Sequence, residues 1–312
     1  MNKRLRIWLA ALAVLALLFY GGVGWLETSS MIGNNPRWRG MNRGPADFGL
    51  SGETVSFPSP DGIPLKAWWL PAAPASRGTV IVAHGIDHTR QVMLPRAVFL
   101  VQGGYDVLAL DLRGHGESGG TVVSPGLLES RDIFGAVRYV RSCGNNRPIA
   151  VLGVSYGAAA TLIAAADSSE INAVVADGAF LSGRDVFEDI NHHYLHDAGM
   201  KLWMRALFLG ASCPGLIPAT SLVYRLRTGI GLGPDLVTVM PAVRRIGIPV
   251  LLITGERDWI APTAKTRQIL AALPGHRNSL AIIPGALHDT TYSAAPEVYS
   301  GAVLKFLADN VR

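Results

Sequence analysis

The chain has 312 residues, of which 49% are hydrophobic and 16% charged, and its formal net charge is +5. This length and composition fit one α/β domain of ordinary enzyme size, and the chain contains no internal repeat, low-complexity tract or glycine-rich phosphate-binding motif. The first 50 residues hold six Lys or Arg and two Asp or Glu, which is +4 of the total charge. Because the remainder is nearly neutral, the basic surface of a nucleic-acid-binding domain is excluded.

Residues 7–26 form an apolar stretch without a charged residue. A helix of about 20 such residues spans about 30 Å of hydrocarbon, and the stretch has Trp8, Tyr20 and Trp25 near its ends, where membrane-interface aromatics lie. We therefore expect an uncleaved transmembrane anchor. The expected organisation is a basic tail at residues 1–6, the anchor at 7–26, a linker at 27–52 and the catalytic domain at 53–312.

Basic residues flank the anchor on both sides in equal number. Lys3, Arg4 and Arg6 lie directly against it, whereas the downstream arginines begin about ten residues beyond it, so the positive-inside rule favours a cytoplasmic N-terminus and an outward-facing enzyme domain. The opposite orientation, with the enzyme in the cytosol, stays open. A secreted protein with a cleaved signal peptide is a further alternative, although residues 21–24 (Gly-Gly-Val-Gly) match a cleavage site poorly. Residues 37–39 (Arg-Trp-Arg) either contact anionic head groups or belong to a solvated linker.

Apolar runs of strand length alternate with helix-like segments after residue 60. Such alternation predicts a largely parallel sheet with helices on both faces. Strands are expected at residues 65–70, 80–83, 107–110, 148–154, 173–176, 249–254 and 280–283, and helices at 94–102 and 127–141.

Residues 153–157 have the sequence Gly-Val-Ser-Tyr-Gly and lie between an expected strand and an alanine-rich, helix-favouring run at 158–166. This context is typical of a nucleophile elbow, where the serine hydroxyl projects from the sheet edge and the glycines allow close backbone approach. The short motif alone is weak evidence, because glycine-rich chains produce it by chance. Ser155 is the predicted nucleophile, and it needs a base and an orienting carboxylate elsewhere in the chain.

Some seventy residues separate the expected strands at 173–176 and 249–254, far more than the usual connection of about 2 to 6 residues. We expect a lid insertion at about residues 180–245. Its apolar stretch at 202–209 either forms a wall over Ser155 or packs on the sheet. A wall would favour acyl or other apolar substrates.

Histidines and cysteines raise the questions of a metal site and a disulfide. His192, His193 and His196 lack the Glu of a His-Glu-x-x-His helix, and a serine nucleophile with its own base needs no metal. We expect them to be surface or lid-packing residues, and we expect neither a metal nor a cofactor. Cys143 and Cys213 do not make a disulfide framework. Buried free thiols are expected, with a bridge as the alternative in an extracytoplasmic domain.

Two later strand ends supply a carboxylate and an imidazole. Asp258 lies on the turn after the strand at 249–254, and His288 follows the run at 280–283. Functional groups of open α/β sheets meet at the carboxyl ends of the strands. The order Ser155, Asp258, His288 therefore predicts a Ser-His-Asp triad.

The oxyanion that forms during acyl transfer needs backbone N–H donors. We expect them at Ile86, after the His-Gly turn that ends the strand at 80–83, and at Tyr156, the residue after the nucleophile. His84 is expected only to shape that turn. Asp177 is the alternative triad acid, since it also follows a strand, and Asp289 is expected to act on the adjacent His288 only indirectly.

Three segments together resemble the α/β-hydrolase family: residues 80–85, residues 105–118 with the string Asp-Leu-Arg-Gly-His-Gly-Glu-Ser, and the elbow. The chain looks most like the lipase, esterase and serine-aminopeptidase branch, which includes monoacylglycerol-lipase-like enzymes, over about residues 53–310. The resemblance implies an α/β-hydrolase fold with a mostly parallel eight-stranded sheet, helices on both faces and a lid insertion, here preceded by one transmembrane helix. It also implies that Asp111 and His115 are structural.

The sequence thus predicts a membrane-anchored serine hydrolase that cleaves an ester bond of a small-molecule acyl substrate. Ester cleavage is preferred over peptide cleavage, because an amide leaving group needs better-positioned protonation. A serine aminopeptidase-like peptide hydrolase is the alternative. A non-catalytic binding module with the same fold is a further one, against which the complete triad argues.

Overall fold

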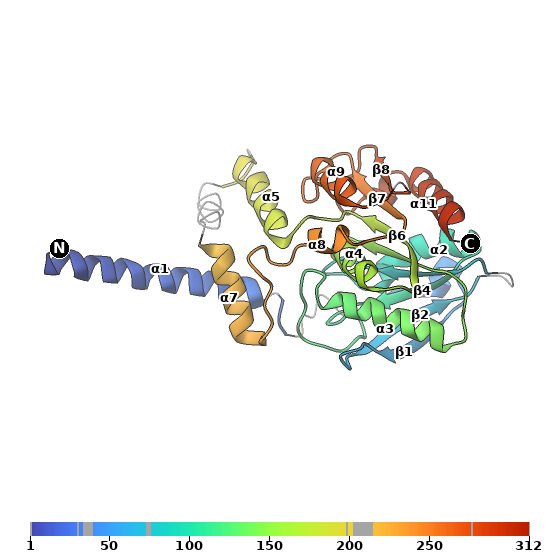
Figure 1. The fold of residues 1–312 in the computed structure, drawn as a ribbon, viewed down its shortest axis with the longest axis horizontal. Helices are drawn as coiled ribbons and strands as arrows, with labels where there is room; N and C mark the ends of the chain where they lie inside the picture. The colour runs from blue at the N-terminus through green and yellow to red at the C-terminus, as the bar shows by residue number, and fades with distance from the viewer. Residues whose placement is uncertain are drawn as a thin grey trace.

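The structure is a computed structural model that describes residues 2–29, 31–33, 40–72, 76–197, 199–201, 215–275 and 277–311. A long N-terminal helix, α1 (Lys3–Ser29), projects from an α/β body (Figure 1). The apolar stretch at 202–209, Cys213 and residues 37–39 lie outside the described residues.

An eight-stranded sheet forms the centre of the body, in the order β1-β2-β4-β3-β5-β6-β7-β8. β2 pairs antiparallel with both β1 and β4, whereas all other neighbours are parallel. The prediction of a mostly parallel eight-stranded sheet is therefore confirmed. The strands are β1 (Glu53–Pro58), β2 (Pro64–Leu70), β3 (Thr79–Ala83), β4 (Asp106–Asp111), β5 (Ile149–Val154), β6 (Ile171–Asp177), β7 (Val250–Gly255) and β8 (Ser279–Ile283).

The central strands are buried on both faces, which explains why they read as uninterrupted apolar runs. Every residue of β3, β4 and β7 is buried. Successive side chains of a strand point to opposite faces, so Ile81 and Ala83 join the hydrophobic cluster on one face of the sheet and Val80 and Val82 join the cluster on the other.

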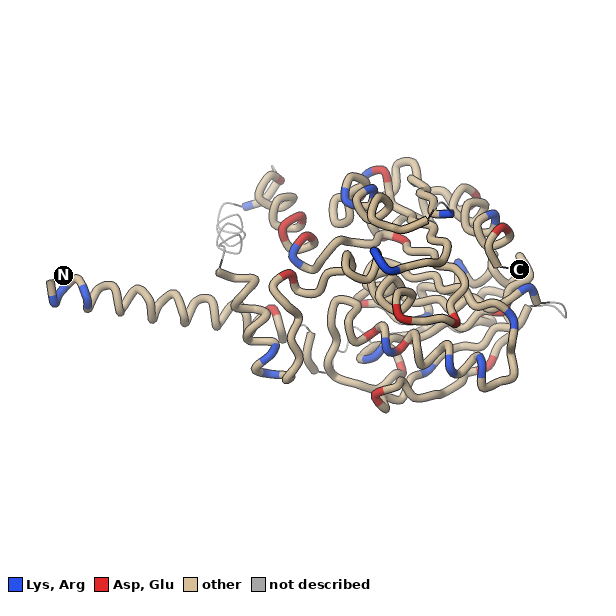
Figure 2. The backbone as a smooth tube through the Cα atoms, in the orientation of Figure 1, with Lys and Arg blue, Asp and Glu red and all other residues tan. Residues whose placement is uncertain are grey.

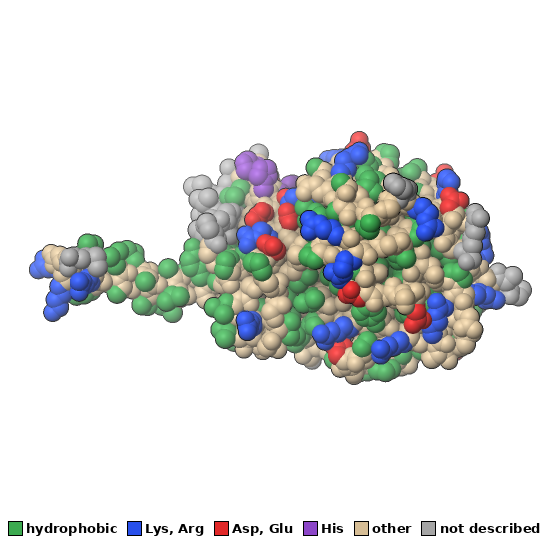
Figure 3. Space-filling model, viewed as in Figure 1, with side chains coloured by type: hydrophobic (Ala, Val, Ile, Leu, Met, Phe, Trp, Pro, Cys, Tyr) green, Lys and Arg blue, Asp and Glu red, His purple; other side chains and the backbone are tan. Residues whose placement is uncertain are grey.

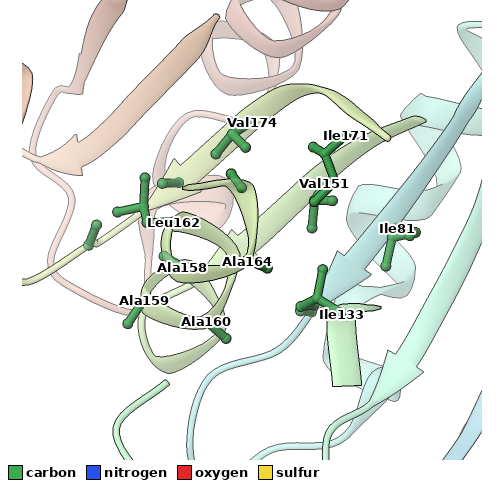
Figure 4. Close-up of a cluster of buried hydrophobic side chains, with 14 of the residues drawn as sticks. Ile81, Ile133, Val151, Ala158, Ala159, Ala160, Leu162, Ala164, Ile171 and Val174 are labelled. Carbon is green, nitrogen blue, oxygen red and sulfur yellow. The ribbon is translucent and has the colours of Figure 1, made fainter. Parts of the chain in front are cut away.

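Helices cover both of these faces. In the cluster around α4, the small side chains of Ala158 and Ala164 pack near Val151 and Val174 of the sheet (Figure 4). This face is covered by α3 (Glu129–Ser142), α4 (Tyr156–Asp167), α8 (Met240–Val243) and α9 (Thr263–Ala272); the other is covered by the 3-10 helix η3 (Arg90–Met93), α2 (Leu94–Gln102) and α11 (Pro296–Asn310). The short helices η2 (Pro45–Phe48) and α10 (Thr291–Ala294) complete the body.

The connection from β6 to β7 holds the expected insertion. It contains α5 (Gly183–His196), α7 (Leu216–Thr228) and the short α8. α5 and α7 stand at the end of the body where α1 joins it, and α7 crosses the inner end of α1 (Figure 1).

Among the described helices, only α1 is long and apolar enough to cross a membrane, with a mean hydropathy of 2.1 and 6% of its most apolar window buried. It contains the predicted anchor and continues to Ser29. Its basic residues lie at its free, N-terminal end (Figure 2), and the next charged residue of the helix is Glu27, in its last turn. Beyond the helix, Ile32 forms an antiparallel bridge with Val122, which ties the chain to the body.

Candidate active site

Ser155 lies on the turn between β5 and α4, with φ 52° and ψ −109°. A positive φ is rare for an L residue and is held only by surrounding structure. A Cβ at Gly153 would lie 2.2 Å from the Gly157 carbonyl oxygen, and a Cβ at Gly157 would lie 2.6 Å from two carbonyl oxygens at the end of β3. Both glycines of the motif are therefore required by close backbone packing, and together they hold the serine at the sheet edge.

The structure brings the predicted serine, histidine and aspartate together. His288 Nε2 lies 2.8 Å from Ser155 Oγ, and His288 Nδ1 lies 2.8 Å from Asp258 Oδ2. Because a carboxylate only accepts hydrogen bonds, Nδ1 carries the proton and Nε2 is left to accept from the serine hydroxyl. This tautomer is the one that a general base for Ser155 requires.

Asp258 is held in place from its other side as well. Its side chain is 0% exposed. Oδ1 accepts hydrogen bonds from the backbone N–H groups of Ile260 at 2.9 Å and Ala261 at 2.8 Å. The loop after β7 thus fixes the carboxylate orientation and leaves Oδ2 for the imidazole.

Backbone hydrogen bonds join the loop after β7 to the loop after β8. The N–H of Glu256 donates to the Ile283 carbonyl at 3.0 Å, and the N–H of Arg257 donates to the Ala286 carbonyl at 2.9 Å. In the reverse direction, the Gly285 N–H donates to the Glu256 carboxylate at 2.8 Å. These bonds set the spacing between the loop that carries the carboxylate and the loop that carries the imidazole.

The electrostatic environment favours the protonated form of His288. Burial by itself lowers the pKa of the imidazole, but the hydrogen bond and charge of Asp258 outweigh it, and Asp177 and Asp289 add smaller effects of the same sign. The pKa of His288 is therefore raised above its ordinary value of 6.5. The imidazolium that forms when the ring takes the serine proton is stabilised by these charges.

The predicted oxyanion donors flank the nucleophile. Tyr156 is the first residue of α4, and Ile86 directly follows Gly85, where a Cβ would lie 3.5 Å from Ser155 Cβ. Among the hydrogen bonds of the described residues, neither the Ile86 N–H nor the Tyr156 N–H is a donor. Both N–H groups are therefore available to an incoming oxygen, and the start of α4 adds partial positive charge.

Asp177, the alternative acid, lies in a different set of contacts. Its Oδ2 accepts hydrogen bonds from Arg96 at 3.1 Å, Thr291 at 2.8 Å and Tyr299 at 2.9 Å. Since His288 Nδ1 is bonded to Asp258, Asp177 is not the residue that orients the imidazole in this structure.

Sequence reasoning missed the buried partners of Asp177. They join α2, β6, α10 and α11 just behind the imidazole, where a Cβ at Gly178 would lie 3.0 Å from His288 Cε1. One signal was present, because Arg96 is the only charged residue of α2, whose other residues before its last position are apolar. A lone charge in a buried helix needs a buried partner of opposite sign.

His84 has the turn-shaping role expected of it. Its Nδ1 donates to the Gly85 carbonyl at 2.7 Å, and its Nε2 accepts from the Leu112 N–H at 3.1 Å. Burial lowers the pKa of His84 to about 4, so the ring is neutral near neutral pH. It links the turn after β3 to the turn after β4.

The string at residues 111–118 forms a buried ion-pair network. Asp111 pairs with the Arg90 guanidinium and accepts the Arg90 N–H at 2.7 Å. Arg113 pairs with Asp132 at 2.7 Å and with Asp61 at 2.8 Å. These contacts fasten the loop after β4 to neighbouring elements, which fits the structural role implied by the family resemblance.

The insertion contacts the Asp258 loop through α5. The His193 ring stacks on Trp259 at a centroid distance of 3.9 Å. Lys265 of α9 lies 3.0 Å from Asp185 Oδ1 and 2.6 Å from Asp189 Oδ2. One end of the insertion is thereby fixed beside the residue that orients the imidazole.

The other two histidines of α5 stack on each other, with centroids 4.3 Å apart for His192 and His196. Within the described residues, no group of three or more His, Cys, Asp or Glu side chains is placed to hold a metal ion. Cys143, after α3, is a free and exposed thiol, so the expectation that it is buried is wrong. The turn that ends α3 leaves it at the surface.

Comparisons with known proteins agree with this fold. The family model described as "Serine aminopeptidase, S33" matches residues 74–213. The protein YfhR of Escherichia coli K12 is 27% identical over 265 residues, which cover 82% of this chain and 81% of YfhR. The α/β hydrolase domain-containing protein WAV2 of Arabidopsis thaliana is 23% identical over 273 residues, with 84% of this chain and 80% of WAV2 covered.

Among solved structures, the Pyrococcus furiosus esterase Pf2001 superposes with a TM-score of 0.71 at 24% identity, covering 90% of this chain and 99% of the esterase. The sheet order, the strand–serine–helix turn and these matches agree with one another. They show that the chain has the α/β-hydrolase fold and that it is similar to esterase- and peptidase-like proteins.

Proposed function

We propose that the protein is a serine hydrolase that cleaves esters of apolar acyl groups. The proposal rests on the 2.8 Å distance between His288 Nε2 and Ser155 Oγ. On the other side of the same ring, His288 Nδ1 lies 2.8 Å from Asp258 Oδ2. A serine hydroxyl is a weak nucleophile at neutral pH, and this arrangement supplies the base that activates it.

In the acylation step, Ser155 Oγ attacks the ester carbonyl carbon while His288 Nε2 takes the hydroxyl proton. The N–H groups of Ile86 and Tyr156 stabilise the oxyanion, and each such donor contributes about 3 to 4 kcal/mol to transition-state binding. The tetrahedral intermediate collapses as His288 returns the proton to the leaving alcohol. The acyl group is then bound to Ser155 as an ester.

In the deacylation step, water attacks the acyl-enzyme with His288 Nε2 again as the general base. The same two N–H groups hold the second oxyanion. Collapse releases the carboxylic acid, and the proton returns to Ser155 Oγ. The imidazole thus acts as base and acid in turn, and Asp258 keeps its orientation throughout.

Carboxylates of the insertion support ester over aminopeptidase substrates. An aminopeptidase needs negative charge for the substrate ammonium group. Asp185 and Asp189 both pair with Lys265, and Asp235 pairs with Arg184 at 2.9 Å. Each of these three carboxylates is already in an ion pair within the chain. The similarity to the esterase Pf2001 points the same way, whereas the match to the serine aminopeptidase family model keeps aminopeptidase activity as the second candidate.

The proposal includes anchoring by α1, with the N-terminus in the cytoplasm and the enzyme domain outside. The apolar length of α1 and the basic residues at its outer end support it. Packing of the inner end of α1 on the body favours a retained helix over a cleaved signal peptide.

A fluorophosphonate probe tests the nucleophile. We expect the intact protein to be labelled and Ser155→Ala to be inert, with Ser293→Ala, on α10, labelled like the wild type. Hydrolysis of p-nitrophenyl esters of rising chain length, beside aminoacyl anilides, then decides between ester and peptide cleavage. Equal labelling of wild type and Ser155→Ala would exclude the proposed mechanism.

The exposed thiol of Cys143 tests orientation. In intact cells that express Cys213→Ser, a membrane-impermeant maleimide should label Cys143 if the domain faces outward, and Cys143→Ser in the same background is the control. Labelling only after lysis would place the enzyme in the cytosol. An N-terminal sequence of the mature protein that starts after the apolar stretch of α1 would show a cleaved signal peptide and would contradict anchoring.

A further inference from the structure

The inner end of α1 packs closely on α7 of the insertion. A Cβ at Gly24 would lie 3.3 Å from the Thr220 backbone and 3.3 Å from Val223 Cγ2. A Cβ at Gly215, at the start of α7, would lie 2.9 Å from the Tyr20 ring. The two helices therefore meet over more than one turn, and small residues at the contact let their backbones approach.

Arg227 fastens the end of this contact. Its guanidinium donates to the Trp25 carbonyl at 3.2 Å, to Thr28 Oγ1 at 2.8 Å and to Ser29 Oγ at 2.9 Å. It also lies 4.0 Å from the centroid of the Trp25 ring. A cation at a helix C-terminus satisfies its last carbonyls and interacts favourably with its dipole. α7 thus acts as a cap for the end of α1.

The face of α7 that carries Leu222 and Leu226 is apolar. No part of the described chain covers this face. Leu222 is 56% exposed and Leu226, one turn later, is 76% exposed. The inward face is apolar as well, with Leu216, Ile217 and Tyr224 buried. A helix on a solvated surface carries polar residues outward. On α7 the exposed positions are Pro218, Leu222, Arg225 and Leu226.

Charge on α7 has one sign. The helix contains Arg225 and Arg227 and no Asp or Glu. Nearby on α1, Trp25 is 56% exposed and Leu26 is 71% exposed. An apolar face beside basic residues is the pattern of helices that lie in the lipid headgroup region, where anionic lipids add attraction. Figure 3 shows hydrophobic side chains along α1 and over the adjoining end of the body.

The position of α7 along α1 agrees with such a location. The helix rises about 1.5 Å per residue, so residues 7–19 of α1 span about 20 Å of a hydrocarbon layer of about 30 Å, and the predicted anchor ends within the next two turns, at residue 26. α7 begins beside Tyr20 and ends beside Ser29. It therefore lies where α1 leaves the hydrocarbon and enters the headgroup layer.

We propose that α7 and the last turns of α1 form a lipid-contact surface, made of Trp25, Leu26, Leu222 and Leu226, that rests on the bilayer into which α1 inserts. This inference rests on the proposed anchoring. Its occupant is the bilayer, because the surface continues an apolar membrane-length helix and the charged residues of α7, Arg225 and Arg227, are both basic. The insertion is then held between the membrane surface and the loop that carries Asp258.

Site-specific fluorescence tests the surface on the full chain. An NBD label is placed by Leu226→Cys in a Cys143→Ser, Cys213→Ser background, in nanodiscs with one copy each, made of phosphatidylcholine and phosphatidylglycerol with a spin-labelled lipid as quencher. The matched control is Val298→Cys on α11, which is 53% exposed and also apolar. We expect strong quenching and a blue-shifted emission at position 226 and neither change at position 298.

Quenching at position 226 no greater than at position 298 would overturn the proposal. The label at position 226 could instead be quenched or buried only when each disc holds two copies. That result would assign the surface to contact with a second copy and would also overturn the lipid-contact proposal. The fluorophosphonate reaction of Ser155 and the hydrolysis of a soluble short-chain ester are measured on the same samples. If both reactions persist while quenching at position 226 is absent, the surface proposal fails and the hydrolase proposal stands. If the chain does not insert into the nanodisc, the anchoring proposal fails together with the surface proposal.

Discussion

The sheet edge around Ser155 and the contact between α1 and α7 are built in different ways. At the sheet edge, absent Cβ atoms would lie as little as 2.2 Å from backbone oxygens, and the acid is 0% exposed. At the helix contact the corresponding approach to Thr220 is 3.3 Å, and the hydrogen bonds of Arg227 to Trp25 and Ser29 are exposed. The chemistry thus depends on rigid backbone packing, whereas the helix contact depends on a few side chains that tolerate adjustment.

The largest expected effect is at the orienting acid. Asp258→Asn keeps the shape of the side chain but changes the tautomer that it favours, so Nε2 carries the proton and cannot accept from Ser155. We expect kcat for a p-nitrophenyl ester to fall about 10⁴-fold. The thermal midpoint serves as the control for folding. A fall of less than about tenfold would contradict the assignment of Asp258 and would return Asp177 as the candidate acid.

A glycine pair compares the two regions directly. Gly153→Ala places a methyl group 2.2 Å from the Gly157 carbonyl oxygen, so we expect a loss of about 3 kcal/mol of stability and of most activity. Gly22→Ala in α1, where nothing lies within 4 Å, should keep both. Thermal unfolding in detergent measures the difference. Similar midpoints for the two variants would show that the elbow is not tightly packed.

The helix contact should respond more weakly. Arg227→Gln removes the guanidinium from the end of α1, and we expect a local loss of about 1 kcal/mol. Hydrogen exchange of residues 20–29 should rise by about fivefold, with esterase activity toward a soluble substrate unchanged. Arg225→Gln, one half-turn away on the exposed face, is the matched control. If hydrogen exchange of residues 20–29 were unchanged in Arg227→Gln, the packing at Gly24 would by itself hold α1 on α7.

The smallest expected effect concerns pH. Because the pKa of His288 is raised and the base must be neutral, kcat/KM should fall as pH drops through a midpoint above 6.5. Asp289→Asn removes one of the charges that raise this pKa and should lower the midpoint slightly with little change at high pH. A profile of kcat/KM over about pH 5 to 9 measures both. A wild-type midpoint below 6.5 would contradict this electrostatic account.

Buried parts of the molecule could be predicted from sequence, because doubly covered strands appear as apolar runs. The residues that follow them, Ser155, Asp258 and His288, meet in the structure because parallel strands end at one edge. The choice between Asp258 and Asp177 required coordinates, since both lie at the carboxyl end of a strand and only the hydrogen bond to His288 separates them.

The presence of an insertion could be predicted from the length of the connection, but the contact of its helix α7 with α1 could not. α7 is apolar on two faces, so its sequence shows no clear helical period. Gly24 and Arg227 are about two hundred positions apart, and neither residue signals the other. Burial of Cys143 was predicted from the usual behaviour of cysteine, but the turn after α3 exposes the thiol.

The capped end of α1 also limits how the proposed anchored enzyme can turn. Because Arg227 contacts the last turn of α1 and Ile32 bridges to Val122, the end of the helix is tied to the body at two places, and the body would keep a preferred orientation relative to α1. Each residue inserted into α1 ahead of Tyr20 would rotate the body by about 100° around the membrane normal and raise it by about 1.5 Å. In the proposed anchored enzyme, the length of α1 would therefore set both the direction in which Ser155 faces and its distance from the bilayer.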